Sequence, residues 1–129
     1  MNKLSVVLPA YNEELMVGKT CRVLREVLTE AEIPYELVVV NDGSADGTWA
    51  EIEKAGKKDP NVTGVHFSRN FGKEAAVFAG LAQASGTVIA VMDCDLQHPP
   101  ATLVQMYRLW QDGYEVIEGV KSDRGKEGV

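Results

Sequence analysis

The sequence predicts an α/β fold in which a mostly parallel sheet carries helices on both faces. Short apolar runs rich in β-branched residues alternate along the chain with longer stretches whose apolar residues recur at helical spacing. Polar turn residues follow the apolar runs, and the chain contains no internal repeat. This alternation favours a parallel sheet with right-handed crossovers. A chain of 129 residues is long enough for one domain with its own core.

The first half of the chain contains two strand–helix units. A buried strand over residues 4–8 ends at Pro9 and is followed by a helix. The apolar positions of that helix recur at steps of three and four residues, at Val17, Cys21, Leu24, Leu28 and Ala31. A second strand over residues 35–40 stops at a dense turn signal, and we expect Ser44 or Asp46 to cap the helix that follows.

The second half continues the alternation. The remaining strands are expected at residues 62–67, 88–92 and 114–120, and the remaining helices at residues 74–84 and from residue 100 onward. Because the helix over residues 74–84 is apolar on nearly every side, we expect it to be buried. The polar end of the chain, residues 121–129, is expected to be loose.

The fourth strand runs directly into an acidic motif, Asp93-Cys94-Asp95-Leu96-Gln97. In extended chain, side chains two residues apart point the same way, so Asp93, Asp95 and Gln97 can turn toward one spot. Two carboxylates and one amide oxygen suit Mg2+ or Mn2+. The alternative is a polar turn with a helix cap, but two close carboxylates beside a buried strand repel each other unless a cation or hydrogen-bond donors compensate.

Four polar loops are expected to leave the same edge of the sheet, at residues 10–13, 41–44, 68–73 and 93–97. In open α/β sheets ligands bind just beyond the carboxyl ends of the strands, so a nucleotide would lie there. No Gly-x-Gly-x-x-Gly and no Gly-Lys-Ser/Thr phosphate loop occurs. Dinucleotide oxidoreductases and P-loop enzymes are therefore disfavoured.

Composition excludes several classes of partner. A formal net charge of −6 argues against non-specific nucleic-acid binding, which needs a basic surface. Cys21 and Cys94 have no metal-type spacing and imply no disulfide framework. We recognise no signal peptide, and no apolar run approaches the ~20 residues that span a bilayer. We therefore expect a reduced, cytoplasmic location for this chain and no nucleic-acid partner.

Four motifs stand in order along the chain. They are Pro9-Ala10-Tyr11-Asn12-Glu13-Glu14, Asn41-Asp42-Gly43-Ser44-Ala45-Asp46-Gly47-Thr48, Arg69-Asn70-Phe71-Gly72-Lys73-Glu74 and Asp93-Cys94-Asp95-Leu96-Gln97-His98-Pro99-Pro100. In this combination the chain resembles the family 2 glycosyltransferases. Within that family it resembles the polyprenyl-phosphate glycosyltransferases, of the dolichol-phosphate mannose synthase and bactoprenol glucosyltransferase type. The resemblance covers essentially the whole chain.

The resemblance implies a GT-A, Rossmann-like fold, of which residues 1–129 are the nucleotide-sugar-binding portion. It implies metal-dependent transfer of a sugar, with inversion, from a UDP- or GDP-linked donor to a polyprenyl phosphate. Family members continue with acceptor-binding elements, a catalytic carboxylate and often membrane helices. We therefore expect the parent protein at the cytoplasmic face of the membrane, and this part of it to lack the general base. Without the later elements, exposed apolar surface and a homo-oligomer are expected.

The first two motifs match the part of the family's site that holds the base and ribose. The donor-binding residues implied there are Pro9, Ala10, Tyr11 and Glu13. Tyr11 would pack on the base, and Asp42 matches the acid that hydrogen-bonds the base. The alternatives are that Tyr11 only covers the sheet edge and that Asp42 is an ordinary turn residue. Asn41 stands where an acid is often seen, which leaves Asp42 as the main base-contacting carboxylate.

The acidic motif matches the family's metal site. Asp93 matches the first acid of the metal motif, which lies near the ribose and cation and also binds the donor. Asp95 matches the direct metal ligand and is our catalytic candidate. Gln97 matches a third metal ligand. The resemblance thus implies Mg2+ or Mn2+ as the cofactor.

Basic residues, a cysteine and a histidine complete the expected site. Lys73 and Arg69 are candidates for neutralising phosphate charge, and Lys121 matches a basic residue that contacts the donor. For Lys73 and Arg69, a solvated surface position is the alternative. Cys94 stands where the family usually has a small residue, and the resemblance implies that it adjoins the donor and the metal, where a thiol can oxidise or bind softer ions. His98 is expected to be structural.

A different class of function also fits the length and the order of elements. The chain could be a non-catalytic nucleotide-binding module or a response-regulator-like signalling domain. A response regulator, however, needs an acid pair after its first strand and a phosphate-accepting Asp after its third. Here those strands are followed by Pro-Ala-Tyr-Asn-Glu and by Ser-Arg-Asn, so we favour the enzyme.

Overall fold

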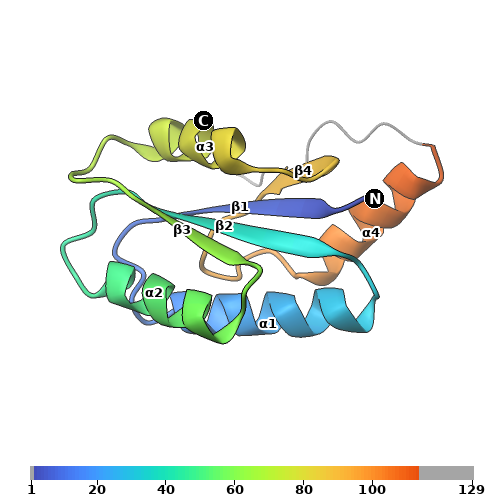
Figure 1. Ribbon diagram of the computed structural model, residues 1–129, viewed down its shortest axis with the longest axis horizontal. Helices are drawn as coiled ribbons and strands as arrows, with labels where there is room; N and C mark the ends of the chain where they lie inside the picture. Colours follow the sequence, from blue (N-terminus) through green and yellow to red (C-terminus); the bar gives the residue numbers. More distant parts are fainter. Residues whose placement is uncertain (1, 114–129) are drawn as a thin grey trace.

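A computed structural model describes residues 2–113 and shows a parallel four-stranded sheet with helices on both faces (Figure 1). The strands are β1 (Leu4–Ala10), β2 (Tyr35–Asn41), β3 (Val62–His66) and β4 (Val88–Val91). The helices are α1 (Val17–Glu30), α2 (Thr48–Lys58), α3 (Lys73–Gln83) and α4 (Ala101–Gln111). The strand order is β3-β2-β1-β4. The predicted α/β fold is confirmed, while the predicted strand over residues 114–120 lies outside the described residues.

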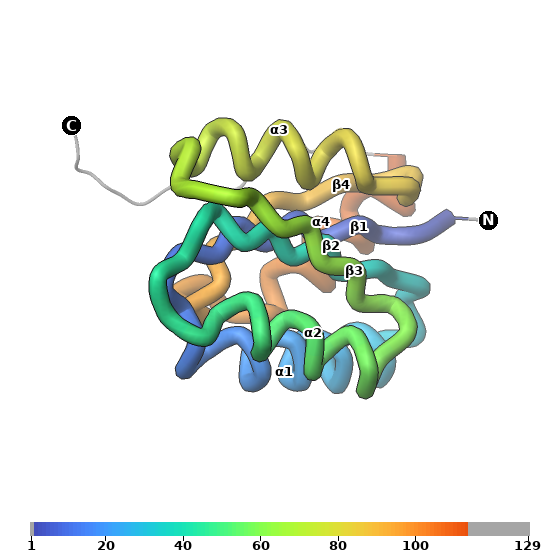
Figure 2. The backbone as a smooth tube through the Cα atoms, turned by 60° about the vertical axis from the view of Figure 1, so that its left-hand side comes forward, coloured from blue at the N-terminus to red at the C-terminus, as the bar shows by residue number. Residues whose placement is uncertain are grey.

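Two apolar cores lie on opposite faces of the sheet. The larger core joins the sheet to α1, α2 and α4, and the smaller one lies under α3, alone on the other face (Figure 2). Residues of β2 alternate between them, since Leu37 and Val39 belong to the larger core and Val38 and Val40 to the smaller. Burial on both faces explains why this strand is a continuous apolar run.

Strand β1 is longer than its sequence predicts, because it continues through Pro9 to Ala10. Its pairing with β2 runs to Ala10, whereas its pairing with β4 ends at Val7. The Ala10 carbonyl accepts a hydrogen bond from Asp42 on the β2 side, so the neighbouring Pro9 nitrogen is directed toward the β4 side. Ladder pairing there has already ended, and the missing N–H of proline costs no hydrogen bond.

Helix α3 is buried on one side only, so the prediction of a fully buried helix was wrong. Ala76 and Gly80 are its buried residues, and a Cβ atom at Gly80 would lie 2.3 Å from the side chain of Val7. The large apolar side chains exposed on α3 and β4 are Phe78, Leu81, Ile89 and Val91. An apolar helix surface shows which residues can be buried, but it does not show which part of the chain buries them. The exposed apolar surface expected from the sequence is present on these elements.

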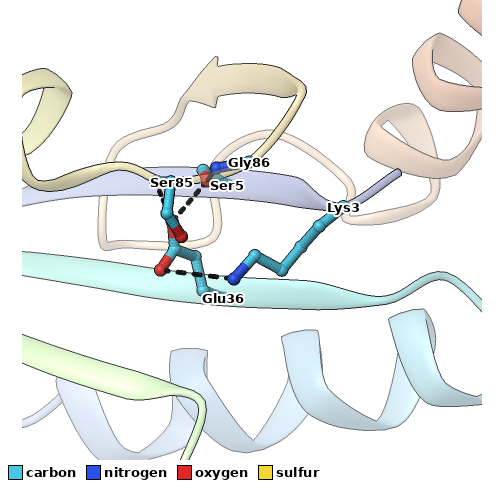
Figure 3. Close-up of polar contacts among 5 residues, drawn as sticks. All are labelled: Lys3, Ser5, Glu36, Ser85 and Gly86. Carbon is cyan, nitrogen blue, oxygen red and sulfur yellow. Dashed lines mark hydrogen bonds and ion pairs between the residues drawn. The ribbon is translucent and has the colours of Figure 1, made fainter. Parts of the chain in front are cut away.

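A polar cluster at the amino-terminal edge of the sheet fastens the turn between α3 and β4 (Figure 3). The Glu36 carboxylate accepts hydrogen bonds from Ser5 Oγ at 2.5 Å and from the N–H and hydroxyl of Ser85 at 2.5 and 3.0 Å. The ammonium of Lys3 lies 4.0 Å from its other oxygen. Burial acts to raise the pKa of Glu36, but these contacts outweigh it and lower the pKa. The ionised carboxylate of Glu36 therefore stabilises this turn.

The cap at the start of α2 differs in detail from the one that the sequence predicted. Gly47 occupies the N-cap position of α2, so neither Ser44 nor Asp46 is the cap itself. The Asp46 carboxylate nevertheless accepts the N–H of Thr48, the first residue of the helix, at 3.0 Å.

Within the part of the chain that is described, no helix combines the length and apolarity needed to cross a membrane.

Candidate functional site

The loops that follow the four strands meet at the carboxyl-terminal edge of the sheet. We call this edge the rim and define it by residues 11–14, 42–48, 69–73 and 93–97. Each of the four sequence motifs contributes residues to the rim, as expected for a parallel sheet whose strands point the same way. Specific contacts tie each loop to a neighbour.

The first and second loops of the rim are joined by reciprocal hydrogen bonds. Asn12 has φ of +55°, and its N–H donates to Ser44 Oγ at 2.9 Å while its Oδ1 accepts the N–H of Ala45 at 2.9 Å. The N–H of Glu13 donates to Thr48 Oγ1 at 2.8 Å. The two loops therefore form one rigid unit. Sequence reasoning gave Asn12 no role, although an Asn in a polar loop is a residue type that tolerates this backbone conformation.

The second loop holds the third through the carboxylate of Asp42. This side chain is buried and accepts the N–H of Phe71 at 2.8 Å, the N–H of Gly72 at 3.1 Å and the Asn70 amide at 3.1 Å. Gly43 reinforces the contact, because a Cβ atom there would lie 2.0 Å from the backbone of Arg69. Gly43 also has φ of +63°, which favours glycine. Asp42 thus organises a neighbouring loop, and its proposed contact with a base stays a prediction.

Lys73 joins the third loop to the fourth. It is the first residue of α3, and its Nζ lies 2.7 Å from Oδ1 of Asp93. In the sheet, β1 lies between β2 and β4. The third loop is held at the end of β2, and Asp93 follows β4. The ion pair therefore bridges the ends of β2 and β4 across the end of β1. Arg69, the other predicted phosphate contact, instead places its guanidinium over the Phe71 ring, 4.7 Å from the centroid.

Carboxylates from the second and fourth loops lie near Glu13 of the first loop. Burial, followed by the charges of Asp95, Asp93 and Asp46, raises the pKa of Glu13. This effect requires the acidic motif to lie close to the first loop. The rim is therefore a region of negative potential, in which the carboxylates repel one another and a bound cation would relieve the repulsion.

The acidic motif does not have the extended geometry that its spacing suggested. Strand β4 ends at Val91, Leu96 has φ of +60°, and the N–H of Gln97 donates to Asp95 Oδ1 at 3.1 Å. Strand alternation therefore does not align Asp93, Asp95 and Gln97, and that step of the argument was wrong. Between residues 2 and 113, no cluster of three or more His, Cys, Asp or Glu side chains is arranged to hold a metal ion alone. Two carboxylates with an amide nearby still fit a hard cation that brings further oxygen ligands.

Cys94 does not present its thiol to the rim, contrary to expectation. Its side chain is buried in the larger core, and its carbonyl accepts a hydrogen bond from Thr20 Oγ1 at 2.7 Å. Burial, with smaller effects from neighbouring groups, raises the pKa of the thiol to about 12. An inert, protonated thiol does not bind soft metal ions at neutral pH. The same hydrogen bond fixes the acidic motif to α1.

The other predicted donor contacts are divided between surface and core. Tyr11 is half-exposed at the rim, with 49% of its surface accessible, and can pack on a ligand. Ala10 is buried in the larger core, so only its backbone is available. Lys121 lies outside the described residues.

Two surface hollows lie next to the rim, and neither includes the acidic motif. One, of about 440 Å³, lies between α1 and α2, and the other, of about 380 Å³, is lined by residues 12–16 and Asp46. Neither is lined by Asp93 or Asp95.

Comparison with known sequences identifies relatives of this chain. The sequence model of the family described as "Glycosyl transferase family 2" matches residues 5–128. An uncharacterized glycosyltransferase of Bacillus subtilis is 42% identical over 123 residues, which are 95% of this chain and 38% of that protein. A bactoprenol glucosyl transferase of Shigella phage SfV is 38% identical over 126 residues, which are 98% of this chain and 41% of that protein. The chain thus spans about two fifths of the length of these relatives.

Comparison of structures points to the same kind of protein. The solved structure of mannosyltransferase PcManGT from Pyrobaculum calidifontis, in complex with GDP-Man and Mn2+, matches this fold with a TM-score of 0.71. The two sequences are 26% identical, and the match covers 86% of this chain and 33% of that chain.

Proposed function

The chain belongs to glycosyl transferase family 2 and has the GT-A fold, and from that premise we propose that residues 1–129 form a nucleotide-sugar-binding part of a longer enzyme. The observation that carries the proposal is the convergence of the rim loops, where Lys73 lies 2.7 Å from Oδ1 of Asp93 and the Asp42 carboxylate accepts the N–H groups of Phe71 and Gly72. Parallel α/β sheets bind nucleotides at this edge. The half-exposed Tyr11 supplies a surface on which a base can pack.

A divalent cation belongs to this proposal. Asp93 and Asp95 would hold Mg2+ or Mn2+, with Gln97 as a third candidate, and the diphosphate of the donor would supply further oxygens. The Mn2+ named with the archaeal mannosyltransferase supports this assignment. When bound, the cation would stabilise the negative charge that develops on the nucleotide diphosphate as the bond to the sugar breaks.

In this proposal the chain's own residues position the donor. Tyr11 packs on the base beside Asp42, whose hydrogen bonds to the third loop keep that loop beside the base. Pro9 and Ala10 form the floor at the end of β1. Lys73 offers an ammonium next to the diphosphate, and its place at the first turn of α3 keeps it at the rim.

The acceptor is proposed from the relatives. The bactoprenol glucosyl transferase similarity supports a polyprenyl phosphate as the acceptor in the whole protein. We propose that the whole protein acts at the cytoplasmic face of the membrane. A phosphate oxygen would attack the anomeric carbon from the face opposite the leaving diphosphate, which inverts the configuration. Because the nucleophile is already anionic, strong general-base assistance is not required. The response-regulator-like alternative has no support in the family match over residues 5–128.

The test is calorimetric titration of the chain with UDP and with GDP, each with and without Mn2+. We expect one nucleotide to bind only in the presence of the metal, and Asp95→Ala to remove that binding. Asp112→Ala is the matched control, because this exposed acid at the end of α4 is remote from the rim in sequence and its loss should leave binding unchanged. Absence of metal-dependent binding of either nucleotide would refute the proposal. Binding without sugar transfer in the whole protein would support a non-catalytic nucleotide-binding module.

A further inference from the structure

We infer that Lys73 is a resident counter-cation of the acidic motif, which competes with the divalent cation for Asp93. Its ammonium lies 2.7 Å from Oδ1 of Asp93, one of the two carboxylates proposed to hold the divalent cation. When the divalent cation binds this carboxylate, Lys73 releases it and becomes available to the diphosphate of the donor. The inference rests on the proposed function, because it requires a divalent cation at Asp93 and Asp95.

The backbone of Lys73 is held at this point of the rim by the third loop. Gly72, the residue before it, has φ of +106° and donates its N–H to Asp42 at 3.1 Å. The N–H of Phe71 donates to the same carboxylate at 2.8 Å. Because Asp42 is buried, these hydrogen bonds position the start of α3 firmly. The exposed side chain of Lys73 can exchange partners while its backbone stays in place.

The ion pair contributes little to folding stability, which makes the exchange easy. The side chains of Lys73 and Asp93 are 64% and 40% exposed, and exposed ion pairs are weak. Lys73 also occupies the first turn of α3, where the helix dipole disfavours a cation. A lysine that stabilised the helix would instead be expected near its C-terminus. Its position is explained better by the charge of the rim.

The neighbouring charges explain why a counter-cation is useful there. Asp46, Asp93 and Asp95 each lie close enough to Glu13 to interact with it electrostatically. Of the ion pairs found within residues 2–113, the one between Lys73 and Asp93 is the one located at the rim. Its ammonium therefore offsets part of the carboxylate repulsion until a divalent cation does so more completely.

Competition for Asp93 couples the metal to the nucleotide. The free metal must displace Lys73, so its affinity for the protein alone is reduced. A nucleotide diphosphate that binds the displaced ammonium favours the metal-bound arrangement, so metal and nucleotide strengthen each other's binding. Replacing Lys73 with a neutral residue of similar length should therefore change the two affinities in opposite directions.

The experiment measures binding of Mn2+ by electron paramagnetic resonance in the wild-type chain, Lys73→Met and Lys73→Arg. Without nucleotide, we expect Lys73→Met to bind Mn2+ about two- to fivefold more tightly, the range that corresponds to an exposed ion pair. With saturating Mn2+, we expect the same variant to bind the preferred nucleotide diphosphate more weakly, and Lys73→Arg to stay close to wild type. Lys3→Met is the matched control, because it removes a lysine paired with an acid at the opposite edge of the sheet. It should leave both affinities unchanged.

The outcomes separate this inference from the proposed function. If the wild-type chain binds no Mn2+ with or without nucleotide, both the proposed function and the inference fail. If the wild type binds Mn2+ and Lys73→Met binds it equally or more weakly, the inference alone is refuted. Circular dichroism of each variant verifies that helix and strand content is unchanged. Opposite changes in the two affinities would support the inference, since loss of structure weakens both.

Discussion

Replacing Asp42 with alanine removes the acceptor that holds the third rim loop against the end of β2. The buried carboxylate accepts hydrogen bonds from the backbone of Phe71 and Gly72 and from the side chain of Asn70. Hydrogen bonds to a charged group each contribute about 1.5–3 kcal/mol. The loop is partly exposed, with Phe71 50% accessible, so water replaces some of them in the variant. We therefore expect Asp42→Ala to lower the free energy of unfolding by about 3 kcal/mol.

Urea denaturation followed by circular dichroism measures this loss. With an m value of about 1.5 kcal/mol per molar urea, the midpoint should fall by about 2 M. Hydrogen exchange gives a local readout, because the amides of Phe71 and Gly72 should lose protection while those of β1 keep theirs relative to global unfolding. Asp112→Ala removes an exposed carboxylate and should stay within about 0.5 kcal/mol of wild type. A loss below about 1 kcal/mol with unchanged exchange at both amides would show that Asp42 does not hold the loop.

Three further substitutions test other parts of the structure. Gly43→Ala should destabilise the chain by at least about 2 kcal/mol in urea denaturation, since its Cβ would overlap the backbone of Arg69; near-wild-type stability would contradict this packing. Glu36→Gln should cost about 1 kcal/mol at neutral pH. Folding lowers the pKa of Glu36, so the difference in free energy of unfolding between wild type and variant should be complete at pH values above the pKa of an ordinary carboxyl group. It should disappear as the pH falls through the lowered pKa. A difference that does not change with pH would contradict this role of Glu36. Replacing Phe78 and Leu81 with glutamine should reduce concentration-dependent self-association in sedimentation velocity, and an unchanged sedimentation profile would exclude this surface as the contact.

Local sequence patterns predicted most of the fold because they reflect backbone geometry. The continuous apolar run of β2 indicates a strand covered on both faces, and the helical spacing of α1 gives its buried side directly. Helix α3 was the exception, since its apolar residues exceed what the described neighbours cover. The extent of β1 was also misjudged, because proline ends a strand only where its missing N–H would have been paired.

The candidate site was predicted as a set of motifs but not as a set of contacts. Parallel strands place their exits at one edge, so the sequence alone was enough to bring Tyr11, Asp42 and Asp93 to the same rim. It did not reveal that the Asp42 carboxylate is occupied by the third loop. Cys94 illustrates the same limit, because its position between two acids suggested a thiol beside the metal while its side chain packs in the core.

The order of residues thus specifies which helices and strands form, the direction in which the strands run and the edge that carries the polar loops. These properties depend on periodicity and turn chemistry within short stretches of chain. The partners of individual side chains depend instead on how distant segments pack together. The contact between Lys73 and Asp93 joins residues from two different loops, and its length depends on how the whole sheet brings those loops together.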